Sequence, residues 1–330
     1  MKSSDIIRRI TTLMLNRKPF LLTGSPGLGK TDCIVAAANA AKMRCIISHP
    51  VVSDPTDYKG LPAVVDGGAQ FLPFGDLQNL IDCTKPTVFF LDDIGQAPAS
   101  VQAALMQLVL CRKINGHRIS DNVTFAAATN RRSDKAGVGT FITPLLDRFD
   151  QVYALDFDIN DWVGWALQNG QPESIVGFAR FRPSLVSDFK QPKDDLSKCP
   201  TPRSVAKLGE LIKLGLDDFD TYSAACGEGF ASEFAAFRKT RDQMPDIDEV
   251  IKSPDDAAMP TRPDVLYATA AALAFRVNAG NFANILRYGD RMSPEFRVML
   301  VKDCLAKSRT LESNPALTKW LIANQGVILG

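Results

Sequence analysis

The first half of the chain alternates short apolar runs with longer segments of helical character. Five runs have the length and composition of buried strands, namely residues 19–23, 44–48, 87–91, 123–128 and 151–155. Among the segments between them, residues 98–110 are rich in strong helix formers and predict a helix. Strands that alternate with helices are typical of a parallel sheet flanked by helices. We therefore predict an α/β domain over residues 1–158.

Two segments interrupt this alternation. Residues 54–62 are rich in turn formers, and residues 63–73 predict a hairpin around residues 66–68. The second segment, residues 112–119, has an Asn-Gly pair at 115–116 between alternating residues, which is a strong hairpin signal. Both segments are thus expected to lie outside the main sheet.

Strand-like runs are missing from the second half. Residues 159–330 have helical character with breaks at prolines, and predict an all-helical lid and C-terminal region. Residues 190–202 are the most linker-like stretch. Residues 262–275 and 293–301 predict packed helices, the latter with a serine N-cap and a proline at 293–294. Core packing explains both helices without a functional site.

The composition is that of an ordinary globular protein. Of 330 residues, 45% are hydrophobic and 23% are charged, and the formal net charge is +1. This charge gives no global attraction to nucleic acid or to an anionic membrane, although it leaves a local basic patch open. Seven scattered cysteines without C-x-x-C spacing indicate reduced thiols, not disulfides or zinc. With only His49 and His117, a histidine-based triad or metal site is not expected.

The chain shows no sign of a membrane or export segment. Its first residues carry charges where a signal peptide needs an apolar core. The uncharged, largely apolar stretch at residues 265–275 is too short to span a bilayer. We therefore expect a soluble, cytoplasmic protein without membrane insertion.

Residues 24–31 match the P-loop pattern G-x-x-x-x-G-K-[ST] at every defined position. The glycines let the backbone turn its N–H groups inward around phosphate oxygens, and the following helix points its positive end at them. The lysine places a charge on the β- and γ-phosphates, and the threonine hydroxyl can complete a magnesium shell. A glycine-rich turn before an ordinary helix is the alternative interpretation. The residues expected to bind ATP are Gly24, Ser25, Pro26, Gly27, Leu28, Gly29, Lys30, Thr31 and Asp32.

Two further apolar runs end in polar residues that suit the same site. Residues 87–91 lead into Asp92, which can hold Mg²⁺ together with Thr31, and Asp93, which can orient or deprotonate the attacking water. Another run ends at Asn130. Ligands of a parallel sheet bind beyond the carboxyl ends of its strands, so we expect Asn130 beside Asp92, near the γ-phosphate or the water. A solvated turn is the alternative for each of these strand ends.

The order of these parts resembles the AAA+ ATPases, and among them the MoxR-like branch. The resemblance covers residues 20 to about 210 and includes the Walker A, Walker B and sensor 1 motifs. The matching segments are residues 24–31, 88–93, 102–106, 126–130, 145–149 and 201–204. In that family one hairpin is inserted in the second helix and another precedes sensor 1. The two interrupting segments stand in those places.

The resemblance implies hexameric rings in which each ATP lies at a subunit interface. Arg148, in Leu-Leu-Asp-Arg-Phe, then looks like the arginine finger that reaches into the neighbour's site. Arg203, at the start of a lid helix, looks like sensor 2, which contacts the γ-phosphate. A guanidinium suits both roles because it is planar, always charged and able to bind phosphate bidentately. Without the resemblance neither arginine would be assigned a role.

The chain departs from the family pattern in two places. Many relatives end Walker B with Asp-Glu, whereas this chain has Asp92-Asp93, which leaves slow hydrolysis open. Many MoxR proteins continue with Asn-Arg-Ala-Pro, whereas residues 95–98 read Gly-Gln-Ala-Pro. Any contact made by that arginine is therefore missing here.

The leading functional hypothesis is an ATP-driven remodeler of protein complexes. Relatives of this branch typically act in this way, often with a partner that carries a von Willebrand factor A domain. The first alternative is a nucleic-acid motor, because Arg112, Lys113, His117 and Arg118 cluster on one predicted hairpin, although no aromatic platform for bases accompanies them. The second alternative is a nucleotide-gated scaffold that binds ATP and barely hydrolyses it.

Overall fold

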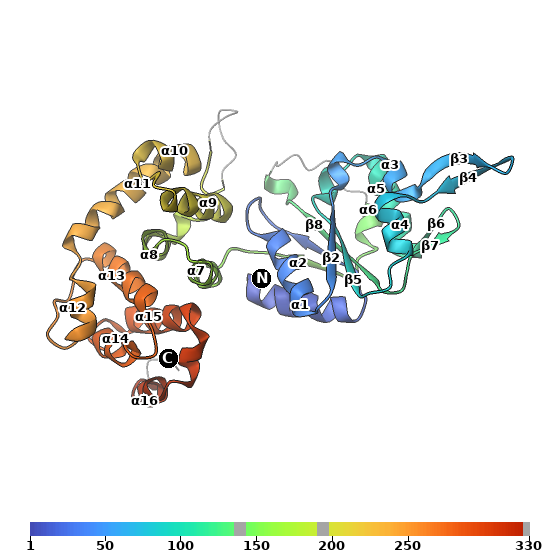
Figure 1. The fold of residues 1–330 in the computed structure, drawn as a ribbon. Helices are drawn as coiled ribbons and strands as arrows, with labels where there is room; N and C mark the ends of the chain where they lie inside the picture. Colours follow the sequence, from blue (N-terminus) through green and yellow to red (C-terminus); the bar gives the residue numbers. More distant parts are fainter. Residues whose placement is uncertain (135–142, 190–197, 326–330) are drawn as a thin grey trace. The chain divides into compact units, whose positions relative to one another are not determined.

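The computed structural model describes residues 1–134, 143–189 and 198–325 (Figure 1). The chain forms two compact units, which we call the sheet unit (Met1–Phe157) and the helical unit (Asp158–Gly330). Most of the linker-like stretch predicted at residues 190–202 lies outside the described residues. Each unit is described separately below.

The sheet unit is built on a five-stranded sheet in the order β2-β5-β8-β1-β9. Every neighbouring pair in it is parallel. The strands are β1 (Phe20–Thr23), β2 (Arg44–Ser48), β5 (Thr87–Leu91), β8 (Val123–Thr129) and β9 (Gln151–Ala154). These are the five predicted apolar runs, and each bound agrees to within one residue. The predicted parallel sheet is therefore confirmed.

Helices cover both faces of this sheet (Figure 1). They are α1 (Ser3–Leu15), α2 (Lys30–Ala40), α3 (Pro55–Lys59), α4 (Gly75–Ile81), α5 (Ala99–Cys111) and α6 (Thr143–Leu146). Short 3-10 turns lie at Pro50–Val52, Ile94–Gln96 and Arg132–Asp134. The helix predicted at residues 98–110 is α5, shifted by one residue.

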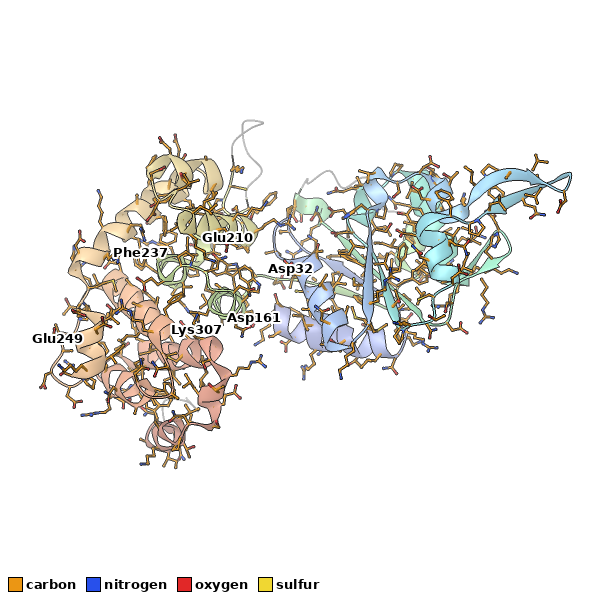
Figure 2. The ribbon with its side chains drawn as sticks, in the orientation of Figure 1. Asp32, Asp161, Glu210, Phe237, Glu249 and Lys307 are labelled. Carbon is orange, nitrogen blue, oxygen red and sulfur yellow. The ribbon has the colours of Figure 1, made fainter. Side chains whose placement is uncertain are left out.

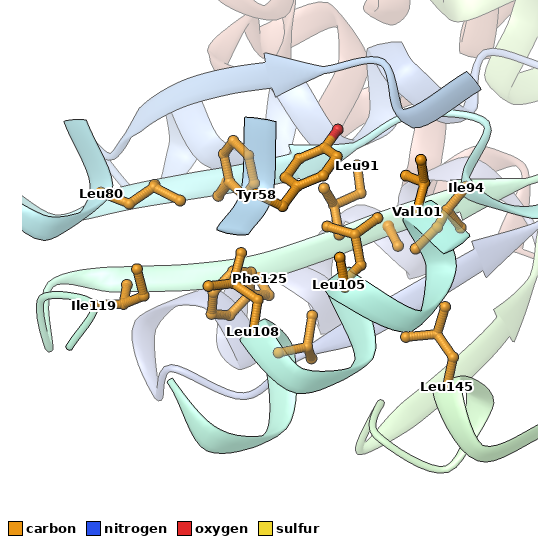
Figure 3. Packing of buried hydrophobic residues seen from close by; sticks show 14 of the residues in the cluster. Tyr58, Leu80, Leu91, Ile94, Val101, Leu105, Leu108, Ile119, Phe125 and Leu145 are labelled. Carbon is orange, nitrogen blue, oxygen red and sulfur yellow. The ribbon is translucent and has the colours of Figure 1, made fainter. Parts of the chain in front are cut away.

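The strand period of two divides the buried side chains between the faces of the sheet. On β5, Val88 and Phe90 pack against α1 and α2, whereas Phe89 and Leu91 pack against the helices α3 to α6. Figure 3 shows the second cluster, which includes Tyr58 of α3, Leu105 and Leu108 of α5, and Phe125 of β8. The rings of Phe89 and Phe125 meet edge to face at 6.2 Å. Both faces of the central strands are thus buried, as a helix-covered parallel sheet requires.

Two hairpins stand apart from the main sheet. One pairs β3 (Leu61–Val65) with β4 (Gly68–Leu72), and the other pairs β6 (Lys113–Ile114) with β7 (His117–Arg118). Both hairpins were predicted from their turn residues. They are joined to each other, because Asn115 Nδ2 donates to the backbone oxygen of Lys59 at 2.8 Å and His117 Nε2 donates to that of Phe71 at 2.7 Å. The second hairpin therefore braces the first.

The helical unit contains only helices and 3-10 turns in its described residues. Its helices are α7 (Ile159–Gln168), α8 (Glu173–Phe181), α9 (Pro202–Lys213), α10 (Phe219–Cys226), α11 (Glu228–Arg238), α12 (Ile247–Lys252), α13 (Pro263–Arg276), α14 (Phe282–Gly289), α15 (Pro294–Lys307) and α16 (Pro315–Ala323). Ser293 stands at the N-cap of α15 as predicted. Its hydroxyl donates to the Glu295 carboxylate at 2.9 Å and does not cap the helix, so that detail of the prediction was wrong.

Aromatic packing and one buried ion pair hold the helical unit together. Phe178 of α8 meets three phenylalanines of α11, among them Phe237, at centroid distances of 5.1 to 5.6 Å. Arg180 on the same helix pairs with Asp303 of α15, and both side chains are buried. Figure 2 shows Phe237 on α11 and Lys307 on α15, where the Lys307 ammonium donates to a backbone oxygen of α7 at 3.3 Å.

Two predictions from composition can be compared with the structure. All seven cysteines are free thiols. Among the described residues, no helix combines the length and the apolar character that crossing a membrane requires.

Candidate functional site

The loop between β1 and α2 carries the P-loop residues. Gly27 and Gly29 have φ of +77° and +86°, which is the left-handed region that glycine reaches without steric cost. At Gly24 the space is limited, since a Cβ there would lie 3.0 Å from the backbone oxygen of Leu155. Helix α2 begins directly after the loop at Lys30, so its first N–H groups, which have no partner within the helix, lie at the loop. The backbone of this loop therefore has the conformation that binding of an anion such as phosphate requires.

Lys30 is buried, with 7% of its surface exposed, and three oxygens are among the partners of its ammonium. Nζ donates to the backbone oxygens of Gly24 at 2.9 Å and Ser25 at 3.1 Å, and to Oδ1 of Asn130 at 2.7 Å. These contacts offset the desolvation of a buried charge. None of the three oxygens carries a full charge, so a phosphate would be a stronger acceptor for the same ammonium. Asn130, directly after β8, lies beside the P-loop through this bond to Lys30, whereas the prediction had placed it beside Asp92.

Thr31 and Asp92 form the second contact of the site. The Thr31 hydroxyl donates to Oδ2 of Asp92 at 3.0 Å. Hydroxyl and carboxylate oxygens suit Mg²⁺, which is usually held by one or two protein ligands with water and phosphate oxygens around the rest. In the described ranges, no group of three or more His, Cys, Asp or Glu side chains could hold a metal ion alone. The pair therefore fits a Mg²⁺ ion that is shared with a nucleotide.

Asp93 has a left-handed backbone, with φ of +54° and ψ of +35°. Among residues with a Cβ, Asp and Asn adopt this region most readily, because their short polar side chains bond locally. The N–H of Asp93 donates to Oδ1 of Asp92 at 3.1 Å. The local conformation is thus one that aspartate adopts more readily than glutamate.

The other P-loop residues lie where the sequence predicts. Ser25, Pro26 and Leu28 complete the loop, and Asp32 stands in the first turn of α2, where Figure 2 labels it. An acid in the first turn is stabilised by the helix dipole. The contacts of these residues with a nucleotide stay predictions.

The two predicted arginines are not part of these contacts. Arg148 follows α6, and its Nη1 lies 3.2 Å from the exposed carboxylate of Asp147. Arg203 is the second residue of α9 and is exposed. The start of α9 is fixed by a capping box, in which the side chains of Thr201 and Ser204 accept each other's backbone N–H. The helix start agrees with the prediction, and the roles of both arginines stay predictions.

Arg131 belongs to the rim of the site and was not predicted from the sequence. Its Nη2 donates to the backbone oxygen of Leu155 at 2.9 Å and to Oδ1 of Asp156 at 2.5 Å. The Leu155 oxygen is also the atom that limits the space at Gly24. Arg131 therefore holds the backbone against which the P-loop begins. The available signal was its position directly after Asn130, at the polar end of a buried strand.

Arg112, which was predicted to belong to a basic cluster, makes contacts within the chain. Its Nη2 donates to the backbone oxygen of Ser120 at 2.6 Å, and its guanidinium lies over the ring of Phe125 at 5.7 Å. Burial lowers the pKa of Arg112 from its ordinary value. Arg112 thus closes the base of the β6–β7 hairpin.

The other basic residues of this hairpin are only partly available. His117 is bonded to β4, as described above, and Arg118 pairs with Asp121 at 3.2 Å. Lys113 is exposed at the start of β6. Three of the four predicted basic groups are therefore engaged within the chain.

Residues 20–157 match the family model of the ATPase family associated with various cellular activities, AAA. This segment is therefore an AAA ATPase domain with a P-loop. No curated protein is significantly similar to the chain. Among solved structures, a mutant of RuvB from Thermotoga maritima is 16% identical, covers 82% of this chain and 80% of that one, and has a TM-score of 0.44. NtrX from Brucella abortus in complex with ADP is 15% identical, covers 94% and 67%, and has a TM-score of 0.43.

Proposed function

We propose that the protein is an ATP-driven remodeler of protein complexes of the MoxR type, which works as a hexameric ring with ATP at subunit interfaces. The observation that carries the proposal is the pair of contacts Lys30–Asn130 and Thr31–Asp92, which assembles the predicted side chains at one edge of the sheet. The AAA match over residues 20–157 supports the ATPase part.

Each side chain of the site has a role that follows from its chemistry. Lys30 would place its charge on the β- and γ-phosphates, and Thr31 and Asp92 would hold Mg²⁺. A Mg²⁺ ion held there would supply positive charge against the negative charge that develops on the phosphate oxygens. Asp93 would orient the attacking water and accept its proton. Asn130 would donate its amide N–H to the γ-phosphate or accept a hydrogen bond from the water.

The ring part of the proposal depends on two arginines. Among the described residues, Arg148 has one charged partner, Asp147, and its Nε is buried without a hydrogen-bond partner. Only the carboxylate of this pair is well exposed to water, and a pair of this kind contributes little free energy, so Arg148 can exchange it for the phosphate of a neighbouring subunit. Arg203, held at the start of α9 by the capping box, would act as sensor 2. Both guanidinium groups would bind the γ-phosphate as it leaves.

The substrate in this proposal is a protein complex, reached through a partner that carries a von Willebrand factor A domain. The support is the MoxR-like order of motifs, which includes hairpins at residues 61–72 and 113–118 in the positions of the family's insertions. The nucleic-acid alternative loses support, because Arg112, His117 and Arg118 are engaged in contacts within the chain. A phosphate backbone would find Lys113 as the remaining cation of the predicted cluster.

The test is ATP turnover per subunit, measured with Mg²⁺ over a wide range of protein concentration. A site shared between subunits predicts that turnover rises as rings form, and that Arg148→Ala lowers it by ~10³-fold, as for other arginine fingers. Arg8→Ala is the matched control, since Arg8 is an exposed arginine of the same unit with a nearby aspartate. A rate that is independent of concentration would exclude the shared site. Near-zero turnover at every concentration would favour the nucleotide-gated scaffold.

A further inference from the structure

The surface of residues 47–74 in the sheet unit has an unusually high share of exposed apolar side chains. Of the nineteen large apolar side chains that are exposed in the described chain, eight lie in this segment. Val52 and Val64 are 82% and 80% exposed, and Leu61, Phe71 and Leu72 of the β3–β4 hairpin are exposed as well. Exposed apolar groups in this density mark an interaction surface, whereas single ones are ordinary.

A cavity of about 260 Å³ lies beside the base of this hairpin, and Val52, Tyr58, Phe74 and two aspartates are among its walls. The Tyr58 hydroxyl is bonded to Ser48 at 2.9 Å and therefore needs no ligand. Burial raises the pKa of Tyr58, and the charges of the aspartates, Asp57 and Asp76, act in the same direction. This volume is below the ~300–1,000 Å³ of pockets for whole small molecules, so it suits a single side chain.

The charge and the backbone of this surface define what it can bind. Between residues 47 and 76 the chain has four aspartates and one lysine, so the surface favours a cation. Among the described residues, β3 pairs only with β4, which leaves its other edge able to accept a further strand. The brace from His117 and Asn115 holds the hairpin in place for such pairing.

We propose that this surface binds an extended, apolar segment of a partner polypeptide, with one basic side chain of that segment in the cavity between Asp57 and Asp76. The segment adds a strand to the open edge of β3 and covers Val64 and its neighbours. This inference rests on the proposed function in so far as the polypeptide is the protein partner that the ATPase remodels.

The test uses the full chain and short fluorescein-labelled peptides of alternating valine and threonine, with arginine, glutamine or glutamate at the centre. Binding is followed by fluorescence polarisation without ATP, so that a failed ATPase proposal does not affect the readout. Asp76→Asn is compared with Asp82→Asn, an exposed aspartate at the end of the same helix. Val64→Thr is compared with Val152→Thr, an exposed valine of β9.

We expect the arginine peptide to bind roughly tenfold more tightly than the glutamine peptide, because it gains a hydrogen-bonded ion pair. Asp76→Asn removes most of this preference and Val64→Thr weakens all three peptides, whereas both controls behave like the unchanged protein. Equal binding of the arginine and glutamate peptides would overturn the proposal. So would binding of single-stranded DNA in place of the peptides, or assembly of the chain with itself that Val64→Thr abolishes while no peptide binds.

Discussion

Each unit contains a buried cation, and the two cations have different surroundings. In the helical unit, Arg180 donates to both carboxylate oxygens of Asp303 and, at 2.6 Å, to Oδ1 of Asn160. In the sheet unit, Lys30 donates to two backbone oxygens and to the amide oxygen of Asn130. The arginine meets a full negative charge inside its own unit, whereas these three acceptors of the lysine carry partial charges.

This difference indicates that the charge of Arg180 stabilises the fold, whereas the charge of Lys30 is placed to bind a ligand. A buried arginine with a bidentate carboxylate is satisfied, and its contacts join α8 to α15 and α7. The lysine lies at a loop that is formed for an anion, where its ammonium is placed to act on a ligand. Removal of Arg180 should therefore affect stability first, and removal of Lys30 should affect chemistry first.

The largest expected effect is on the stability of the helical unit. Arg180→Ala leaves the buried carboxylate of Asp303 without its partner, which costs about 3–5 kcal/mol. The chain's three tryptophans, Trp162, Trp165 and Trp320, all lie in the helical unit. Denaturant unfolding followed by tryptophan fluorescence therefore reports on the helical unit. ATP binding by the folded sheet unit should persist.

The double variant Arg180→Met with Asp303→Leu is the control for this prediction. Replacing both charges by apolar groups of similar size should recover most of the lost stability. An unchanged unfolding midpoint in Arg180→Ala would contradict the structural role of the pair.

The next effect is on turnover in the sheet unit. Lys30→Met keeps an apolar stem of similar length and removes the charge, so ATP turnover should fall about 10²–10³-fold while the fold is retained. Lys18→Met is the matched control, because Lys18 is an exposed lysine of the same unit, paired with Asp150. Normal turnover in Lys30→Met would show that this buried charge does not act on phosphate.

A smaller effect concerns the helix that carries Arg203. Thr201→Ala removes the N-cap of α9 and should cost about 0.5–2 kcal/mol, measured by the same tryptophan signal. Thr201→Ser keeps an acceptor oxygen and should retain most of the stability. A loss in Thr201→Ser as large as that in Thr201→Ala would show that the hydroxyl bond to Ser204 is not what stabilises the helix.

The smallest expected effect is a difference in pH dependence between two capping boxes, that of α3 in the sheet unit and that of α9 in the helical unit. Asp54 caps α3, and the hydrogen bond from the Thr56 N–H lowers the pKa of its carboxyl. Because the folded-state pKa is depressed, the cap contributes fully above the ordinary value near ~3.9 and is lost as pH falls through the lower folded value. The Thr201 cap has no titrating acceptor and should be unaffected.

Amide NMR shifts of Thr56 and Ser204 during an acid titration test this difference. The Thr56 shift should change with a midpoint below the ordinary aspartate value, and the Ser204 shift should not follow it. A midpoint at or above that value would contradict the cap geometry of Asp54.

The sequence was sufficient for the sheet and for the centre of the site. Strand ends follow from apolar runs that stop at polar residues, and the parallel order brings Asp92 and Asn130 to one edge. The proximity of Lys30 to Asn130, which are 100 positions apart, follows from that rule. The P-loop could be identified from the sequence because the geometry of a phosphate-binding loop requires its glycines and its lysine.

The remaining contacts could not be predicted, for one physical reason. Asn115, His117 and Arg131 donate to backbone oxygens 24 to 56 positions away, and Arg112 donates to one eight positions away. Every residue has such an oxygen, so the acceptor leaves no signal in residue type. A donor on a loop could therefore be found in the sequence, but not its partner. The contacts that engage Arg112 and His117 within the chain were therefore not visible when the hairpin was given as an alternative nucleic-acid site.

The most direct measurement is the ATP turnover of Asp93→Asn and Arg148→Ala chains, alone and mixed. Asparagine tolerates the left-handed backbone of Asp93, so the first variant loses the carboxylate and keeps the conformation. Each variant alone should turn over slowly. A site shared between subunits predicts that the mixture regains activity, because Asp93 of one chain then meets Arg148 of the other. A mixture as slow as the separate variants, although rings form, would contradict the shared site.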